Sequence, residues 1–275
     1  MRAPSFHLAV FCLLATACRW GDNSDFPASA KTMIPPPQFR VWWEVVESCS
    51  GKRARFDDVK WFEVAGEPIV ARGDIANAAW FASGNRIALY KDDIDGALVR
   101  HEMLHAILQD GDHSREYFRE RCGDVVVCGH VCGLPDPPPN STPISLDDVQ
   151  VTVDAYPRFP SFSLHDGRMT FVLNIRNTTS ANAYLPQGAY NAGSCPSGIL
   201  LSSVADPDRI ALACDYPMSG GYTALYRPGE TRSFVFDIDL RHPGDGAGPF
   251  FAERITVAAV LANNVRHTAM VSLLP

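Results

Sequence analysis

The sequence has no long run of Lys and Arg, and its overall charge is negative. The formal net charge is −7 at pH 7. Proteins that bind nucleic acid normally carry a basic face, because contacts with phosphates supply much of their affinity. The composition therefore excludes nucleic acid as a partner. Internal repeats are also absent, and a hydrophobic fraction of 46% indicates a globular, core-forming chain.

The N-terminus lacks a hydrophobic run long enough for a permanent membrane helix. The run from Phe6 to Leu14 is about half the length that spans a bilayer. It follows Arg2 and precedes small residues, which is the layout of a secretory signal peptide. We expect residues 1–17 to be that signal and the protein to be exported.

The end of this segment resembles the signal of bacterial lipoproteins. It reads LLATAC and ends in Cys18, the position that is acylated in that family, although Ala15 stands where leucine is usual. The resemblance implies a lipid anchor on Cys18 that attaches the protein to a membrane of the bacterial cell envelope. Simple secretion is the alternative. Residues 18–38 are rich in small residues and proline, which is typical of a tether.

Export changes the interpretation of the cysteines. Removal of Cys12 with the signal and acylation of Cys18 leave six: Cys49, Cys122, Cys128, Cys132, Cys195 and Cys214. An even number in an oxidising compartment favours disulfide bonds. Candidate pairs are Cys49 with Cys122, Cys128 with Cys132, and Cys195 with Cys214, although sequence alone does not determine connectivity.

A proline-rich segment divides the chain. LPDPPPNSTP, residues 134–143, has five prolines and no apolar periodicity, so it should be extended. We therefore expect a first domain over residues 39–133, a linker over 134–146 and a second domain over 147–275.

The first domain should mix strands and helices. Runs rich in β-branched and aromatic residues predict strands at 39–49, 59–64, 77–82 and 85–90. A helical period then places Leu98, His101, His105 and Leu108 on one face of a helix over 92–109. An aspartate at 92, 93 or 95 would cap this helix and Gly111 would end it. A second short helix is expected over 114–122.

The second domain should be all-β. Strand-like runs recur at 148–156, 168–177, 199–204, 209–216, 223–240 and 254–264, which is the spacing of a β-sandwich. RPGETRSFVFDIDL, residues 227–240, resembles bacterial immunoglobulin-like modules. The resemblance implies a module that binds a substrate, inhibitor or partner, and a structural spacer is equally compatible.

The motif HEMLH, which starts at His101, carries chemistry. Histidines at positions i and i+4 of a helix lie one above the other, so His101 and His105 can bind one metal ion. Glu102 lies about 100° further round the helix axis, where its carboxylate can act on a water molecule as a general base. Zinc suits such a site, because it activates water and commonly takes three protein ligands.

The flanks of the motif resemble those of the zincin metallopeptidases. In LVRHEMLHAI every position other than Arg100 and the His and Glu of the motif is uncharged. The expected strand at 85–90 would lead into the motif helix, as it does in that superfamily. The resemblance implies a peptide or protein substrate. The competing interpretation is a buried core helix, which would pay the cost of burying three polar side chains for no purpose.

The third ligand distinguishes the families. Metzincins need glycine three residues after the second histidine, and this chain has Leu108 there, so that family is excluded. Glu116 and Glu120 could supply the third ligand from the following helix, but they lie very close in sequence to the second histidine. His113 is the better candidate, because a chain reversal at QDGD could return it to the motif. A histidine that opens a helix carrying an aromatic, here His113 and Phe118, resembles the SprT-like metallopeptidases.

The sequence thus predicts an α+β fold, with a minimal zincin-like domain followed by an all-β immunoglobulin-like sandwich. It predicts an exported zinc metallopeptidase in which His101, His105 and His113 bind Zn2+ and Glu102 is the base. Two alternatives remain: a surface binding lipoprotein with an inactive zincin domain, and a zinc hydrolase of cell-wall amides. Asp110 and Asp112 could orient the ligands, although turn formation alone explains them.

Overall fold

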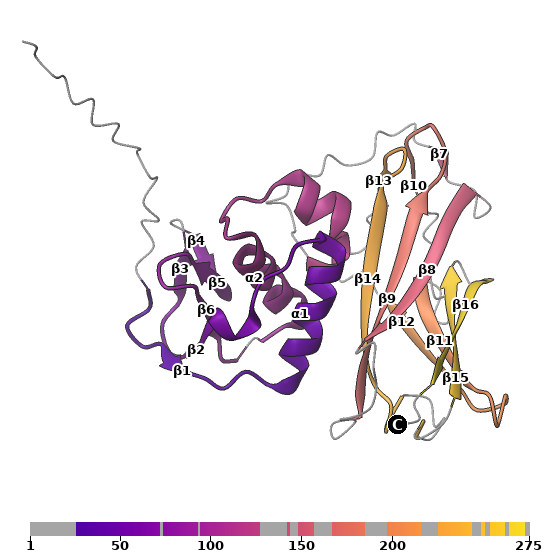
Figure 1. Ribbon diagram of the computed structural model, residues 1–275, viewed down its shortest axis with the longest axis horizontal. Coiled ribbons are helices and arrows are strands. Elements are labelled where there is room, and N and C mark those ends of the chain that lie inside the picture. Colours follow the sequence, from indigo (N-terminus) through magenta and orange to yellow (C-terminus); the bar gives the residue numbers. More distant parts are fainter. Residues whose placement is uncertain are drawn as a thin grey trace, which may run out of the picture.

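The computed structural model describes residues 26–71, 74–92, 94–126, 142–143, 148–156, 167–184, 197–215, 225–243, 249–250, 254–261 and 264–272. The chain is mixed α+β. In Figure 1 the helices lie with a small sheet in the N-terminal half, and long strands make up the C-terminal half. Among the described residues, no helix is both long and apolar enough to cross a membrane.

The N-terminal half contains a four-stranded sheet in the order β1-β2-β6-β5. Strand β2 pairs in parallel with β6, and β5 pairs antiparallel with β6 at the end of the sheet. The bounds are Lys31–Thr32 for β1, Lys60–Val64 for β2, Ala78–Phe81 for β5 and Arg86–Tyr90 for β6, with a separate hairpin of β3 (Ile69–Ala71) and β4 (Asp74–Ala76). The strands expected at 59–64, 77–82 and 85–90 are therefore present.

The strand expected at 39–49 is wrong, because this segment is the helix α1 (Pro37–Ser50). Proline stands in its first turn, and Gly51 ends it in the left-handed conformation with φ 68°. Phe39, Trp43 and Val46 are all buried at helical spacing. Their aromatic and β-branched side chains favour strands locally, but packing of one helical face outweighs that preference.

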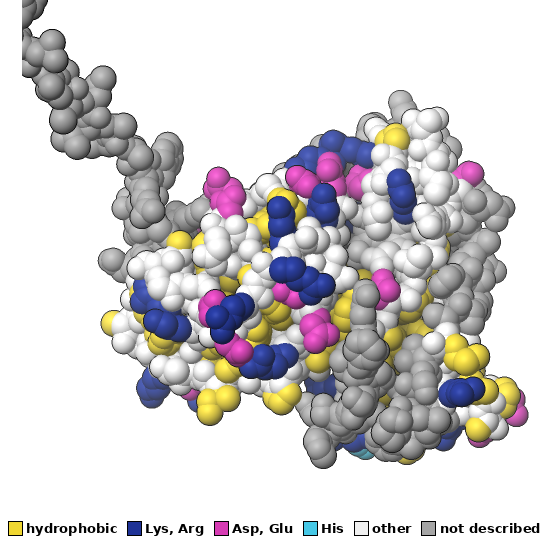
Figure 2. Space-filling view, viewed as in Figure 1, with side chains coloured by type: hydrophobic (Ala, Val, Ile, Leu, Met, Phe, Trp, Pro, Cys, Tyr) yellow, Lys and Arg dark blue, Asp and Glu magenta, His cyan; other side chains and the backbone are white. Residues whose placement is uncertain are grey.

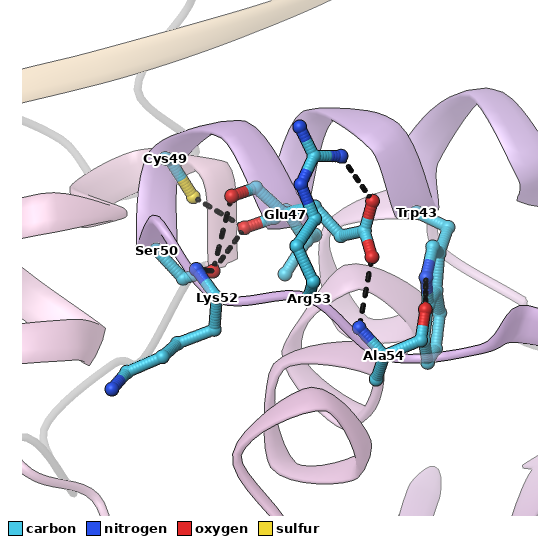
Figure 3. Close-up of polar contacts among 8 residues, drawn as sticks. Trp43, Glu47, Cys49, Ser50, Lys52, Arg53 and Ala54 are labelled. Carbon is cyan, nitrogen blue, oxygen red and sulfur yellow. Dashed lines mark hydrogen bonds and ion pairs between the residues drawn. The ribbon is translucent and has the colours of Figure 1, made fainter.

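Polar contacts close the C-terminal end of α1, as Figure 3 shows. The Glu47 carboxylate accepts hydrogen bonds from Arg53 Nη1 at 2.7 Å and from the Ala54 N–H at 2.9 Å. The Ser50 hydroxyl donates to the Val46 carbonyl at 2.7 Å. The chain that leaves the helix is thereby held against its last turn.

The motif helix α2 spans Gly96–Leu108. The Asp95 side chain caps its start by accepting a hydrogen bond from the Ala97 N–H at 3.0 Å. The helix ends at Gln109, which adopts a left-handed conformation with φ 52°, two residues before the expected stop at Gly111. A short 3-10 helix, η1 (Phe56–Asp58), precedes β2, and a π-helical turn, η2 (Glu116–Arg121), and a 3-10 turn, η3 (Gly123–Val126), follow α2.

The C-terminal half has two main sheets. Their orders are β14-β9-β8 and β12-β11-β15-β16. The bounds are β8 Val149–Tyr156, β9 Arg168–Asn177, β11 Ser197–Ser203, β12 Ile210–Asp215, β14 Thr231–Asp239, β15 Arg254–Leu261 and β16 Asn264–Ser272; the short strands β7 (Thr142–Pro143), β10 (Ala183–Tyr184) and β13 (Leu225–Tyr226) form a third sheet. The six strand segments expected here all contain strands, and the described residues also form β7, β10 and β16, which were not expected.

The sheet β14-β9-β8 contacts two hydrophobic cores. Phe171 and Leu173 of β9 pack with residues of β11 and β15 in the core between the two sheets. Val172 of β9 and Tyr156 of β8 belong instead to the core built around α1 and α2. In Figure 1, α1 correspondingly lies beside β14 and β9.

One expected disulfide bond is present, and it joins Cys49 at the end of α1 to Cys122 after η2. Cys18, Cys128, Cys132 and Cys195 lie outside the described residues, and the side chain of Cys214 does too, so lipidation and the other pairings stay predictions.

The end of the expected tether belongs to the fold. Strand β1 pairs with β2, and the Phe26 ring packs against Phe62 and Phe81 with ring centroids 4.8 and 5.0 Å apart. The ordered structure therefore begins before residue 39. On the face shown in Figure 2, Lys and Arg side chains lie beside Asp and Glu side chains over the N-terminal half. Arg40 and Asp57 form one ion pair of this half.

Candidate metal centre

Three histidine side chains converge beside the motif helix. His101 and His105 come from successive turns of α2, and His113 comes from the chain that returns after it. Their Nε2 atoms lie 3.2 Å apart between His101 and His105, 2.9 Å between His101 and His113, and 3.3 Å between His105 and His113. The three residues are close enough to bind one metal ion.

The geometry fits a tetrahedral ion. Nitrogen ligands at about 2.0–2.1 Å from zinc stand about 3.3 Å from one another in a tetrahedral site. The Nδ1 atom of His105 lies 2.7 Å from the Asp110 carbonyl oxygen, which can only accept a hydrogen bond. The proton of His105 is therefore on Nδ1, and the Nε2 lone pair is directed at the other two imidazoles.

An aromatic ring supports all three imidazoles. Phe118 of η2 is fully buried, and its ring centroid lies 5.0 Å from that of His101, 4.7 Å from that of His105 and 5.0 Å from that of His113. The Trp80 ring of β5 lies nearly parallel to His105, with centroids 6.2 Å apart. The three imidazoles thus lie against aromatic rings that restrict their rotamers.

Glu102 is buried next to the first histidine. One carboxylate oxygen accepts a hydrogen bond from the backbone N–H of Trp80 at 2.6 Å. Burial raises the pKa of Glu102 to about 7, and the hydrogen bond from Trp80 acts in the opposite direction. The cluster therefore combines three imidazoles with one carboxyl group that can exchange a proton near neutral pH.

The other acidic residues near the motif do not join this cluster. Glu116 forms an ion pair with Arg121 at 2.9 Å, and Glu120 forms one with Arg115 at 2.6 Å. Neither belongs to the group of His101, His105 and His113 that could hold a metal.

Asp110 contacts His105 through its backbone carbonyl, and its side chain has the turn-forming role that was the alternative. Its carbonyl is the acceptor for His105, while its side chain accepts from the Asp112 N–H at 3.0 Å and so shapes the turn. Sequence reasoning also missed the Trp80 N–H that contacts Glu102. Backbone groups carry no residue-type signal, so neither contact could be read from the sequence.

Comparisons with known proteins leave the family open. No protein-family model matches the chain, and no curated protein matches it. The solved structures that resemble it include β-glucosidase 3B from Thermotoga neapolitana, with 17% identity over 46% of this chain and 16% of that chain and a TM-score of 0.26. Another is a GH3 β-glucosidase from Bifidobacterium adolescentis, with 15% identity over 46% and 17% of the two chains and a TM-score of 0.26.

A smaller protein also resembles the chain over about half its length. It is the putative ApaA protein from Bordetella pertussis, with 16% identity over 49% of this chain and 98% of that chain and a TM-score of 0.26. The matched region spans less than a fifth of the length of the two β-glucosidases, 16% and 17% respectively. TM-scores this low carry no conclusion about function.

Proposed function

We propose that the protein is a zinc-dependent metallopeptidase with a zincin-like catalytic domain. The observation that supports this most directly is the convergence of the Nε2 atoms of His101, His105 and His113, with the Glu102 carboxyl one residue from the first ligand. Zinc is the proposed ion because three imidazoles that leave one tetrahedral position open are typical of catalytic zinc sites.

In the proposed mechanism the protein supplies the proton transfers. When bound, zinc would polarise the substrate carbonyl and lower the pKa of a water molecule. Glu102 would take the proton of that water as it attacks and would pass it to the leaving amine.

The proposal extends to an exported protein with a lipid anchor on Cys18. The disulfide bond between Cys49 and Cys122 supports export, because such bonds persist in oxidising compartments. We further propose that the two facing sheets of the C-terminal half are an immunoglobulin-like sandwich.

The test is zinc content and hydrolysis in three variants of the full chain. We expect His113→Ala to lose most of its zinc, because two imidazoles remain from the ligand group. Glu102→Gln should keep its zinc and lose hydrolysis of a peptide library by at least about a hundredfold, since the amide cannot act as a base. His242→Ala is the control, because that side chain is 83% exposed and pairs locally with Asp239.

A different result would contradict each part of the proposal. Full zinc occupancy in His113→Ala would exclude His113 as a ligand. Undiminished hydrolysis by Glu102→Gln would exclude it as the base. Zinc binding without peptide hydrolysis would favour a binding lipoprotein, and cleavage of peptidoglycan fragments but not of peptides from casein would favour a cell-wall amidase.

A further inference from the structure

A buried arginine links the motif helix to the C-terminal half. Arg100 directly precedes His101 on α2, and its side chain is 5% exposed. Its Nη1 pairs with Asp237 Oδ2 of β14 at 3.2 Å, and its Nε donates to the Val125 carbonyl at 2.7 Å. The guanidinium also lies over the Trp42 ring of α1, 5.3 Å from its centroid. Each side of this cation therefore meets a different element.

The other oxygen of Asp237 gathers donors from two more elements. Oδ1 accepts hydrogen bonds from Trp42 Nε1 at 2.9 Å, from Thr170 Oγ1 at 2.6 Å and from Gln38 Nε2 at 3.3 Å. Thr170 is the residue opposite Asp237 in the pairing of β9 with β14. One carboxylate of the C-terminal half thus contacts α1, α2 and β9 together.

These contacts bear on the orientation of α2. A buried guanidinium is costly without a counterion, so α2 is most stable where Arg100 reaches Asp237. The first turn of α2 is equally constrained, because a Cβ on Gly96 would lie 2.9 Å from the Trp42 ring. Since Arg100 and His101 are adjacent in the same helix, a displacement of one moves the other.

We propose that Asp237 is a positioning residue for the metal site, although it belongs to the C-terminal sheet. Acting through Arg100, it holds α2 where His101 and His105 meet His113. The C-terminal half is then a required part of the centre instead of a spacer. This inference depends on the proposed zinc binding by the three histidines.

The experiment compares Asp237→Asn with Asp239→Asn in the full chain. Asp239 lies two residues further along the same strand and is 22% exposed against 26% for Asp237, but it pairs with Arg241 of its own segment. We expect Asp237→Asn to weaken zinc binding about tenfold in a chelator competition, because residues that orient metal ligands typically contribute about this much to metal affinity. The absorption bands of the cobalt-substituted protein should also shift. Asp239→Asn should change neither.

A milder variant tests the same inference if Asp237→Asn does not fold. Thr170→Val removes one hydrogen bond to Asp237 and keeps the ion pair, so zinc binding should weaken about two- to threefold. The inference would be overturned if the folded Asp237→Asn protein had wild-type zinc affinity and an unchanged cobalt spectrum. If only Thr170→Val folds, the same two results in that variant would overturn it. If the wild type bound no zinc, the proposed function would fail as well.

Discussion

Phe118 gives the three imidazoles a common support. Its ring is within 5.0 Å, centroid to centroid, of all three histidine rings, and it lies on the π-helical turn η2. Such turns occur often at functional sites, because they redirect a side chain that a regular helix would place elsewhere. The side chain therefore contributes both to the core and to the geometry of the ligands.

Removing this ring should separate the two contributions. We expect Phe118→Ala to lower the free energy of unfolding by about 3–5 kcal/mol, as a cavity left by a buried phenylalanine does, and also to weaken zinc binding. Phe171→Ala is the control, since Phe171 is equally buried in the core between the sheets. It should lose similar stability in chemical denaturation and keep its zinc affinity. Equal zinc affinities in the two variants would contradict the role of Phe118.

Residue-scale predictions from sequence work where the chemistry is local. His101, Glu102 and His105 follow from helical spacing, and His113 is near enough for a turn to return it to them. Asp237 is 137 residues from Arg100, and no short pattern relates the two. Contacts of that kind depend on the arrangement of whole elements, which a single sequence does not encode in any local signal.

At the scale of elements, the disulfide bond joins the end of α1 to the end of η2. Cys49 and Cys122 are 73 residues apart, so the bond closes a loop that contains β2, β5, β6 and the motif helix. It thereby constrains the segment that carries Phe118 and follows His113. Cross-links that close long loops remove much conformational freedom from the unfolded chain.

Replacement of both cysteines by serine should lower the free energy of unfolding by about 4 kcal/mol, the value expected for a loop of this length. Denaturation with and without a reductant is the measurement. In the double variant, any further loss on reduction would report additional disulfide bonds, such as those expected among the remaining cysteines. A double variant within about 0.5 kcal/mol of wild type would show that the bond adds little, as engineered bonds sometimes do.

The helix α1 shows why element types are only partly predictable. Its run of aromatic and β-branched residues favours a strand by propensity, whereas the spacing of Phe39, Trp43 and Val46 suits a helix. Both patterns are present, and the partner surface decides between them. The motif helix and most strands carry one pattern alone, and they are found where the sequence predicts them.

For the whole molecule, the sheet β14-β9-β8 is shared between two cores. Tyr156 and Val172 complete the core of the N-terminal half, and the opposite face of the same sheet packs in the other core. A proline-rich segment indicates a boundary in the chain, but it does not show whether the parts on either side fold independently.

Truncation tests this interdependence. A fragment that ends at residue 133 would expose the surface of α1 that Val172 and Tyr156 cover, and it would leave Arg100 without Asp237. We expect the fragment to unfold without a cooperative transition and to bind zinc much more weakly than the full chain. Circular dichroism during heating and a chelator competition would measure both. Cooperative unfolding together with wild-type zinc affinity would show that the N-terminal half is autonomous.

The closeness of the three histidines in the chain has a consequence for how the metal is acquired. All three lie within residues 101–113. An unfolded chain would keep these imidazoles within reach of one another and so retain part of its zinc affinity. A ligand stabilises a fold only by the difference between its affinities for the folded and unfolded states. If the three histidines bind zinc as proposed, zinc should therefore stabilise the protein less than its native affinity implies, and a chain whose C-terminal strands have not yet folded would already hold the ion.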